Sequence, residues 1–119
     1  MILETFIRCF VNGDALDATV EFYKSLLAGE ESLRFDYPEM GLKLASVSSR
    51  HLSVLVIAGE PDKRAPFEAT RLTIKVTSLE DYAAVLKSAG AELLDPIQNT
   101  PVGRKMRYRH KDGLIVQHG

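Results

Sequence analysis

The chain has 119 residues, of which 45% are hydrophobic and 26% are charged, and its formal net charge is −1. This size and composition predict one globular domain, and the charge gives no global attraction for nucleic acid or an anionic membrane. No apolar run approaches the roughly 20 residues of a membrane span, and the N-terminus lacks the pattern of a signal peptide, so we expect a cytoplasmic protein.

The order strand, helix, strand occurs twice, over Thr5–Tyr37 and again over Arg71–Gln98. Each copy is followed by two further apolar stretches of strand length. A repeat of this length indicates two similar modules, about residues 1–58 and 70–119, within a single domain 1–119. Such modules are expected to pack together, so the cleft between them is the first place to look for a binding site.

The first module begins with a predicted strand over residues 5–11, in which the single cysteine, Cys9, lies on the core face as a small buried hydrophobe. After a turn, apolar residues recur at helical spacing up to Gly29, and Asp14 is expected to cap that helix. The alternation of apolar and polar residues over 32–37 then predicts a strand, and two further strands are expected over residues 42–47 and 51–58. The last of these is continuously apolar, which is typical of a strand covered on both faces.

Residues 59–69 contain two prolines and no periodicity, so we interpret them as a linker between the modules. In the second module, Ser78 is expected to cap a helix, because an acidic residue follows three positions later. The next strand is predicted to end at Asp95–Pro96, and a hairpin closes the chain around the Asp-Gly turn of residues 111–113. The total is eight strands and two helices.

Three segments are typical of one known family, FIRCFVNGDALDATVEFYKSLL, LTIKVTSLEDYAAVLKSAGAEL and VGRKMRYRHKDGLIVQHG. They resemble the vicinal oxygen chelate superfamily, which includes glyoxalase I, extradiol dioxygenases and the bleomycin- and fosfomycin-resistance proteins. The resemblance implies an α+β fold in which two βαβββ modules form an open mixed-sheet barrel with an internal cleft. The rival fold, a ferredoxin-like dimeric barrel, needs one fewer strand per repeat than the chain contains.

Metal-dependent members of this superfamily hold their ion at four strand positions, which His, Gln and Glu usually fill. By resemblance these positions fall at Phe6, near Val54, at Arg71 and at Gln117. Phe6 and Val54 offer no donor atom, and the permanent cation of Arg71 repels a metal. We therefore expect no metal and no cofactor, which favours a binding protein over an enzyme.

The resemblance then favours a protein of the antibiotic-resistance type that binds a small molecule in its cleft without a metal. Ring side chains would wall the cleft and polar side chains would anchor the ligand, and these candidates are Phe6, Arg8, Phe10, Phe35, Tyr37, Arg71, Arg107 and Gln117. The arginines favour an anionic or aromatic ligand over a basic drug. By the same resemblance we expect a homodimer, and the net charge predicts no nucleic-acid or membrane partner.

Two other functions stay open. A metal-dependent lyase or dioxygenase of the same superfamily would need atypical ligands, for which His118 with Gln117 is the one adjacent pair. A structural partner domain would instead show an exposed apolar patch without convergent polar groups. Apart from that pair, the histidines at positions 51, 110 and 118 are expected at strand ends or on the surface.

Overall fold

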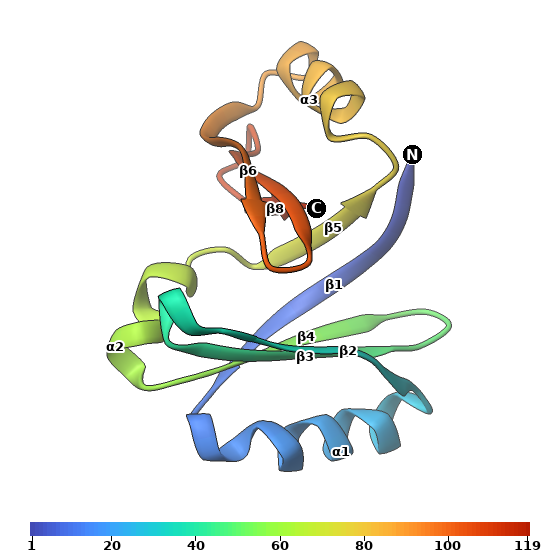
Figure 1. Cartoon of the computed structure of the whole chain (residues 1–119). Helices are drawn as coiled ribbons and strands as arrows, with labels where there is room; N and C mark the ends of the chain where they lie inside the picture. The colour runs from blue at the N-terminus through green and yellow to red at the C-terminus, as the bar shows by residue number, and fades with distance from the viewer. The chain divides into compact units, whose positions relative to one another are not determined.

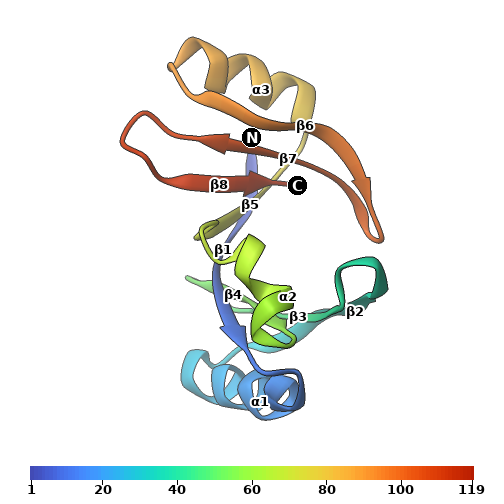
Figure 2. The same ribbon diagram turned by 90° about the vertical axis from the view of Figure 1, so that its left-hand side faces the viewer.

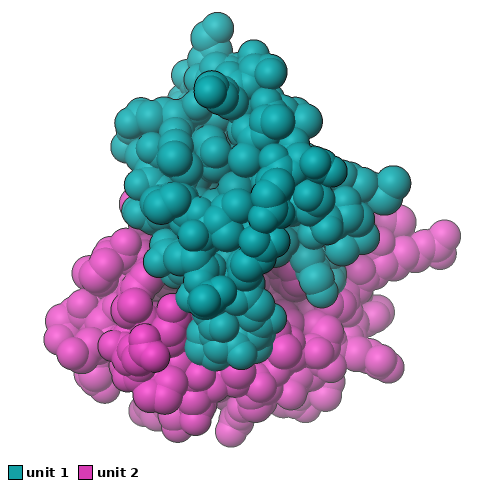
Figure 3. Space-filling model, turned by 45° about the horizontal axis from the view of Figure 1, so that its top comes forward, with its two compact units in different colours: residues 1–5, 70–119 teal, residues 6–69 magenta.

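The computed structural model describes residues 1–119 and contains two compact units, residues 1–5 with 70–119, and residues 6–69 (Figure 3). Each unit combines a mixed sheet with one helix of ten or more residues on one sheet face (Figure 1). The elements follow the order βαβββ twice, which confirms the predicted α+β class. None of the helices combines the length and the hydropathy that crossing a bilayer requires.

In the unit of residues 6–69 the strand order is β2-β3-β4-β1. The bounds are β1 (Ile2–Val11), α1 (Leu16–Leu27), β2 (Glu30–Tyr37), β3 (Leu42–Ser48) and β4 (Ser53–Ala58). Strand β1 is parallel to β4, and the other two pairs are antiparallel. Leu16 and Val20 of α1 are buried against small and branched residues of β3 and β4, so the main core of this unit lies between the helix and the sheet.

Helix α1 begins without a side-chain cap, so the prediction for Asp14 is wrong. A 3₁₀ turn over Gly13–Ala15 leads into the helix, and the backbone bond from the Ala15 nitrogen to the Asn12 oxygen (2.9 Å) closes that turn instead. At the other end the helix ends at Leu27, and the left-handed residue that closes it is Ala28 (φ 50°), one position before the predicted stop at Gly29. A Cβ on Gly29 would lie 2.6 Å from the Ser48 carbonyl oxygen, which explains why a glycine stands there.

The segment of residues 59–69 is more ordered than a plain linker. It contains a short third helix, α2 (Pro61–Arg64), and a 3₁₀ turn over Ala65–Phe67, and both carry a proline in their first two positions, where its missing N–H is not needed. Phe67 packs against the leucine-rich side of the adjacent sheet. The prediction of two helices therefore falls one short, because a four-residue helix shows no periodicity in sequence.

In the unit of residues 1–5 and 70–119 the strand order is β1-β5-β8-β7-β6, with the first residues of β1 at one edge. The bounds are β5 (Leu72–Val76), α3 (Leu79–Ser88), β6 (Glu92–Thr100), β7 (Gly103–Arg109) and β8 (Ile115–His118). Helix α3 lies along one face of these strands (Figure 2). It buries Leu79 and Leu86 against Met106, Tyr108 and Val116.

Strand β6 does not end at Asp95–Pro96, as predicted, but continues to Thr100. Its pairing with β7 shifts register between Asp95 and Gln98, so Pro96 lies inside an irregularity of the ladder. Strand β6 is also an edge strand, where a proline removes no necessary hydrogen bond. The edge position and the bulge together explain how the strand tolerates Pro96.

The Ser78 cap of α3 is confirmed, since its Oγ accepts a hydrogen bond from the Asp81 backbone nitrogen at 3.1 Å. We expect Ser78→Ala to lower the free energy of unfolding by about 1 kcal/mol, measured by urea denaturation, because an N–H of the first turn loses its partner. The matched control is Ser88→Ala at the opposite end of α3, which should cost far less. Equal losses in the two variants would argue against the cap.

Candidate functional site

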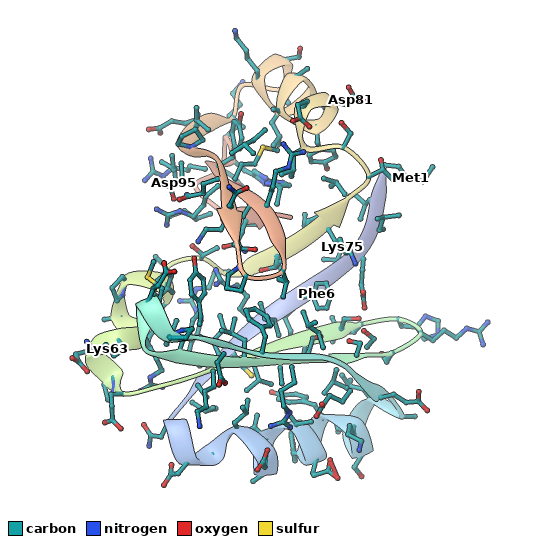
Figure 4. All side chains as sticks on the ribbon, in the orientation of Figure 1. Met1, Phe6, Lys63, Lys75, Asp81 and Asp95 are labelled. Atoms are coloured by element: carbon teal, nitrogen blue, oxygen red, sulfur yellow. The ribbon has the colours of Figure 1, made fainter.

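Four of the predicted ring residues lie on one face of the 6–69 sheet, the face away from α1, as the labelled Phe6 shows (Figure 4). All four are half-buried, and they are Phe6, Phe10, Phe35 and Tyr37. They pack against aliphatic residues of the two central strands, Leu42, Leu44, Leu55 and Ile57. Phe10 pairs with Ile57 and Phe35 with Leu44, so rings from β1 and β2 flank an aliphatic centre.

The same face also carries polar groups. The guanidinium carbon of Arg8 lies 5.7 Å from the centroid of the Phe10 ring, within the range of a cation–π contact. Three serine hydroxyls form a short chain, in which Ser32 lies 2.8 Å from Ser46 and 2.7 Å from Ser48. Sequence reasoning identified Arg8 but not the serines, because serine is common in strands and turns and carries no spacing signal of its own.

Cys9 lies on the opposite face of β1 and packs, half-buried, against the core under α1, which confirms its predicted place on the core face. Burial raises the pKa of its thiol to about 11. Only the thiolate is an effective nucleophile, and this environment suppresses it. Cys9 therefore belongs to the core and not to the candidate site.

The other three predicted residues lie in the second unit. Gln117 of β8 is the register neighbour of Arg107 in β7. Arg107 donates from Nε to the Asp95 carboxylate at 2.7 Å and from Nη1 to the Thr70 hydroxyl at 3.3 Å. The Asp95 carboxylate therefore neutralises the positive charge of the Arg107 guanidinium. Arg107 offers oriented hydrogen-bond donors more than net charge. Arg71, just before β5, is exposed.

A row of polar side chains crosses this second sheet on the face away from α3. In register, Thr73 pairs with Gln117, Gln117 with Arg107, and Arg107 with Asp95. The Thr73 hydroxyl oxygen is buried and makes no hydrogen bond. Sequence reasoning missed Asp95, which it placed at the end of a strand. The bulge in β6 sets it opposite Arg107, and no sequence pattern predicts that shift.

The four strand positions that the resemblance assigns to metal ligands do not carry a set of metal donors. Val54, which was placed on the site face, is fully buried in the core under α1, and the register partner of Phe6 is Ser53. An aromatic ring, a hydroxyl, the Arg71 cation and the Gln117 amide are not the donor set of a divalent ion, which needs several imidazole, carboxylate or thiolate groups. No three His, Cys, Asp or Glu side chains are grouped to hold one.

His118 is the last residue of β8 and is fully buried, so of the two predicted places the strand end is confirmed and the surface is wrong. It points toward α3, where its ring centroid lies 5.2 Å from that of Tyr82, 6.1 Å from Tyr108 and 6.0 Å from His110. Gln117 alternates to the opposite face, so the two cannot form a ligand pair. Burial lowers the pKa of His118 to about 4, and His110 contributes to the same shift.

Comparison with known proteins agrees with this architecture. The family profile described as Glyoxalase/Bleomycin resistance protein/Dioxygenase superfamily matches residues 5–117. The chain belongs to this superfamily. Among curated protein sequences none matches it.

Solved structures of this glyoxalase superfamily fold match nearly the whole chain. An uncharacterized protein from Methanosarcina mazei is 30% identical, with a TM-score of 0.80, and the match covers 99% of this chain and 91% of that one. Methylmalonyl-CoA epimerase from Mycobacterium tuberculosis is 14% identical, with a TM-score of 0.70 and coverage of 98% and 87%. A variant of the Streptomyces coelicolor epimerase in complex with 2-nitronate-propionyl-CoA is 18% identical, with a TM-score of 0.65 and coverage of 98% and 96%. The likeness to the epimerases shows the fold alone.

The pKa of Cys9 leads to a prediction about thiol reactivity. We expect Ellman's reagent to modify Cys9 slowly near neutral pH in the folded protein and rapidly in concentrated urea, because folding both buries the thiol and keeps it protonated. The control combines Cys9→Ala with Ser88→Cys, which places the thiol on an exposed helix end. Fast modification of native Cys9 would show that the thiol is not held in this core.

The buried imidazole of His118 predicts acid sensitivity. Its pKa falls from an ordinary 6.5 to about 4 on folding, so the folded state favours the neutral ring. The stabilisation from this shift is fully present above about pH 6.5. As the pH falls from there toward about 4, the free energy of unfolding decreases by up to roughly 3 kcal/mol. Urea unfolding across this range should show a smaller loss for His118→Phe, whereas exposed His51→Ala should keep the wild-type slope. An unchanged slope in His118→Phe would contradict the assignment.

Proposed function

We propose that this member of the glyoxalase superfamily binds a small anionic or aromatic molecule without a metal. The observation that carries the proposal is Phe6, whose ring packs into an apolar cluster at a position where metal-dependent members place a ligand atom. Small-ligand sites are mostly apolar and contain a few directed polar groups. The ring-bearing face of the 6–69 unit, with Arg8 beside Phe10, has this composition.

We propose separately that the polar face of the second unit can bind an anionic group. Arg71 is the exposed cation there, and Arg107 with Gln117 supplies oriented donors. A guanidinium that a carboxylate already holds contributes directional hydrogen bonds more than net charge. Arg71 is therefore the residue whose loss should affect an anion most strongly on this face.

The Streptomyces coelicolor epimerase is in complex with an acyl-CoA analogue, 2-nitronate-propionyl-CoA. That complex supports testing organic anions, including an acyl-CoA, as ligands of this chain. It does not extend the epimerase reaction to it, because the likeness concerns the fold. From the family resemblance we further propose a cytoplasmic homodimer, which light scattering tests directly.

The first test is metal content together with ligand-induced stabilisation. We expect protein purified without chelators to contain well under one tightly held zinc, nickel or iron ion per chain, and its melting temperature to rise with at least one organic anion or aromatic compound in a panel. Arg71→Ala should lower the affinity for any anion that binds at the polar face of the second unit. Its control is Arg50→Ala, which removes an exposed cation from the β3–β4 turn.

One tightly held ion per chain would instead favour the metal-dependent lyase or dioxygenase with atypical ligands. A panel without any stabilising compound, at the same low metal content, would favour a structural partner domain. Either result would remove the proposed function.

A further inference from the structure

The ring-bearing face of the 6–69 sheet is divided into an apolar part and a polar part. One row across its four strands consists of Phe10, Ile57, Leu44 and Phe35, each the register partner of the next. Two residues along each strand, the neighbouring row holds Arg8, Leu55, Ser46 and Leu33. Two of its four side chains, Arg8 and Ser46, are polar, one row away from a fully apolar one.

The polar part continues beyond that row. Ser53, the partner of Phe6 in β4, is only 2% exposed, and Ser46 in β3 is 3% exposed. Ser32 and Ser48 extend the same hydroxyl chain. The Ser46 hydroxyl is hydrogen-bonded to Ser32, so this buried polar part is satisfied within the sheet.

Arg8 stands where the two parts meet. Its guanidinium lies against the Phe10 ring, which belongs to the apolar row, while Arg8 itself belongs to the polar row. A planar guanidinium matches a carboxylate in shape as well as in charge, and serine hydroxyls can donate to the same oxygens. The boundary therefore suits a compact anionic group with an apolar body on one side.

We infer that the ligand of this face is an amphipathic carboxylate, with an aromatic or branched apolar body over the row from Phe10 to Phe35 and its carboxylate at Arg8 and Ser46. This inference rests on the proposed function and sharpens it, since the anionic and apolar features must belong to one molecule. Adjacent rows are about 7 Å apart, two residues along a strand, which sets the separation between body and charge.

Three matched probes test this: 3-phenylpropionate, its neutral amide 3-phenylpropionamide, and propionate, which lacks the ring. The ring and the carboxylate of 3-phenylpropionate have about the spacing of the two rows. We expect calorimetry and thermal shift to show binding of 3-phenylpropionate at least about tenfold tighter than that of either other probe, since each alternative loses one of the two contacts.

The variants assign the two ends of the probe. Arg8→Gln should reduce the preference for carboxylate over amide to nearly one, Arg8→Lys should keep part of it, and Arg50→Ala should keep all of it. Phe35→Ala should weaken 3-phenylpropionate and leave propionate unchanged. Each variant is first compared with the wild type in melting temperature and far-ultraviolet circular dichroism, and Arg8→Lys serves as the second test if Arg8→Gln is unfolded.

Equal binding of amide and carboxylate, equal binding of propionate and 3-phenylpropionate, or a carboxylate preference that survives in Arg8→Gln would each overturn the inference. The proposed function would survive those results, because a neutral aromatic compound or a simple anion would still be a ligand. If none of the three probes binds, the inference also fails, and the wider ligand panel and metal analysis judge the proposed function separately.

Discussion

The alternation of side chains along β1 and β4 is the constraint on which both the core and the candidate site depend. In β4 every residue is buried, yet successive residues serve opposite faces: Val54 and Val56 pack under α1, while Leu55 and Ile57 support the ring-bearing face. A shift of one residue would exchange the two sets. The pairing of β1 with β4 fixes that register, so the same strand pair positions both the core of this unit and its ring-bearing face.

The second unit shows how the same architecture places its polar groups. There α3 covers the apolar side of the sheet, and the opposite side is free to hold a row of polar residues. His118 and Gln117 are adjacent in sequence but serve these two sides, one as a buried neutral ring and one as an amide beside Arg107. The two units therefore share a plan, with one face of each sheet packed against a helix, whereas the opposite faces differ in composition.

The order of elements and the Ser78 cap could be predicted because each depends on local sequence: strand and helix periods, a capping side chain and turn residues. Three features could not be predicted. A backbone bond within a turn replaces the expected Asp14 cap, and an edge-strand bulge allows Pro96 inside a strand. The helix α2 has only four residues, which is too short to show a periodic pattern in the sequence. The candidate site followed the same division. Strand parity placed Phe6 and Phe10 on the correct face, but a one-residue uncertainty in β4 put Val54 in place of Ser53 or Leu55, and Asp95 depended on a register shift.

Membership of the glyoxalase superfamily fixes the scaffold of this chain without fixing its chemistry. A metal site requires donors at several strand positions together, and neither the ring of Phe6 nor the permanent cation of Arg71 supplies one. The Phe6 ring instead packs on aliphatic neighbours. On the central strand β3, Ser46 pairs with Ser32 within the sheet and lies in the same row as Arg8, at the border of the apolar surface where the proposed anionic group would bind.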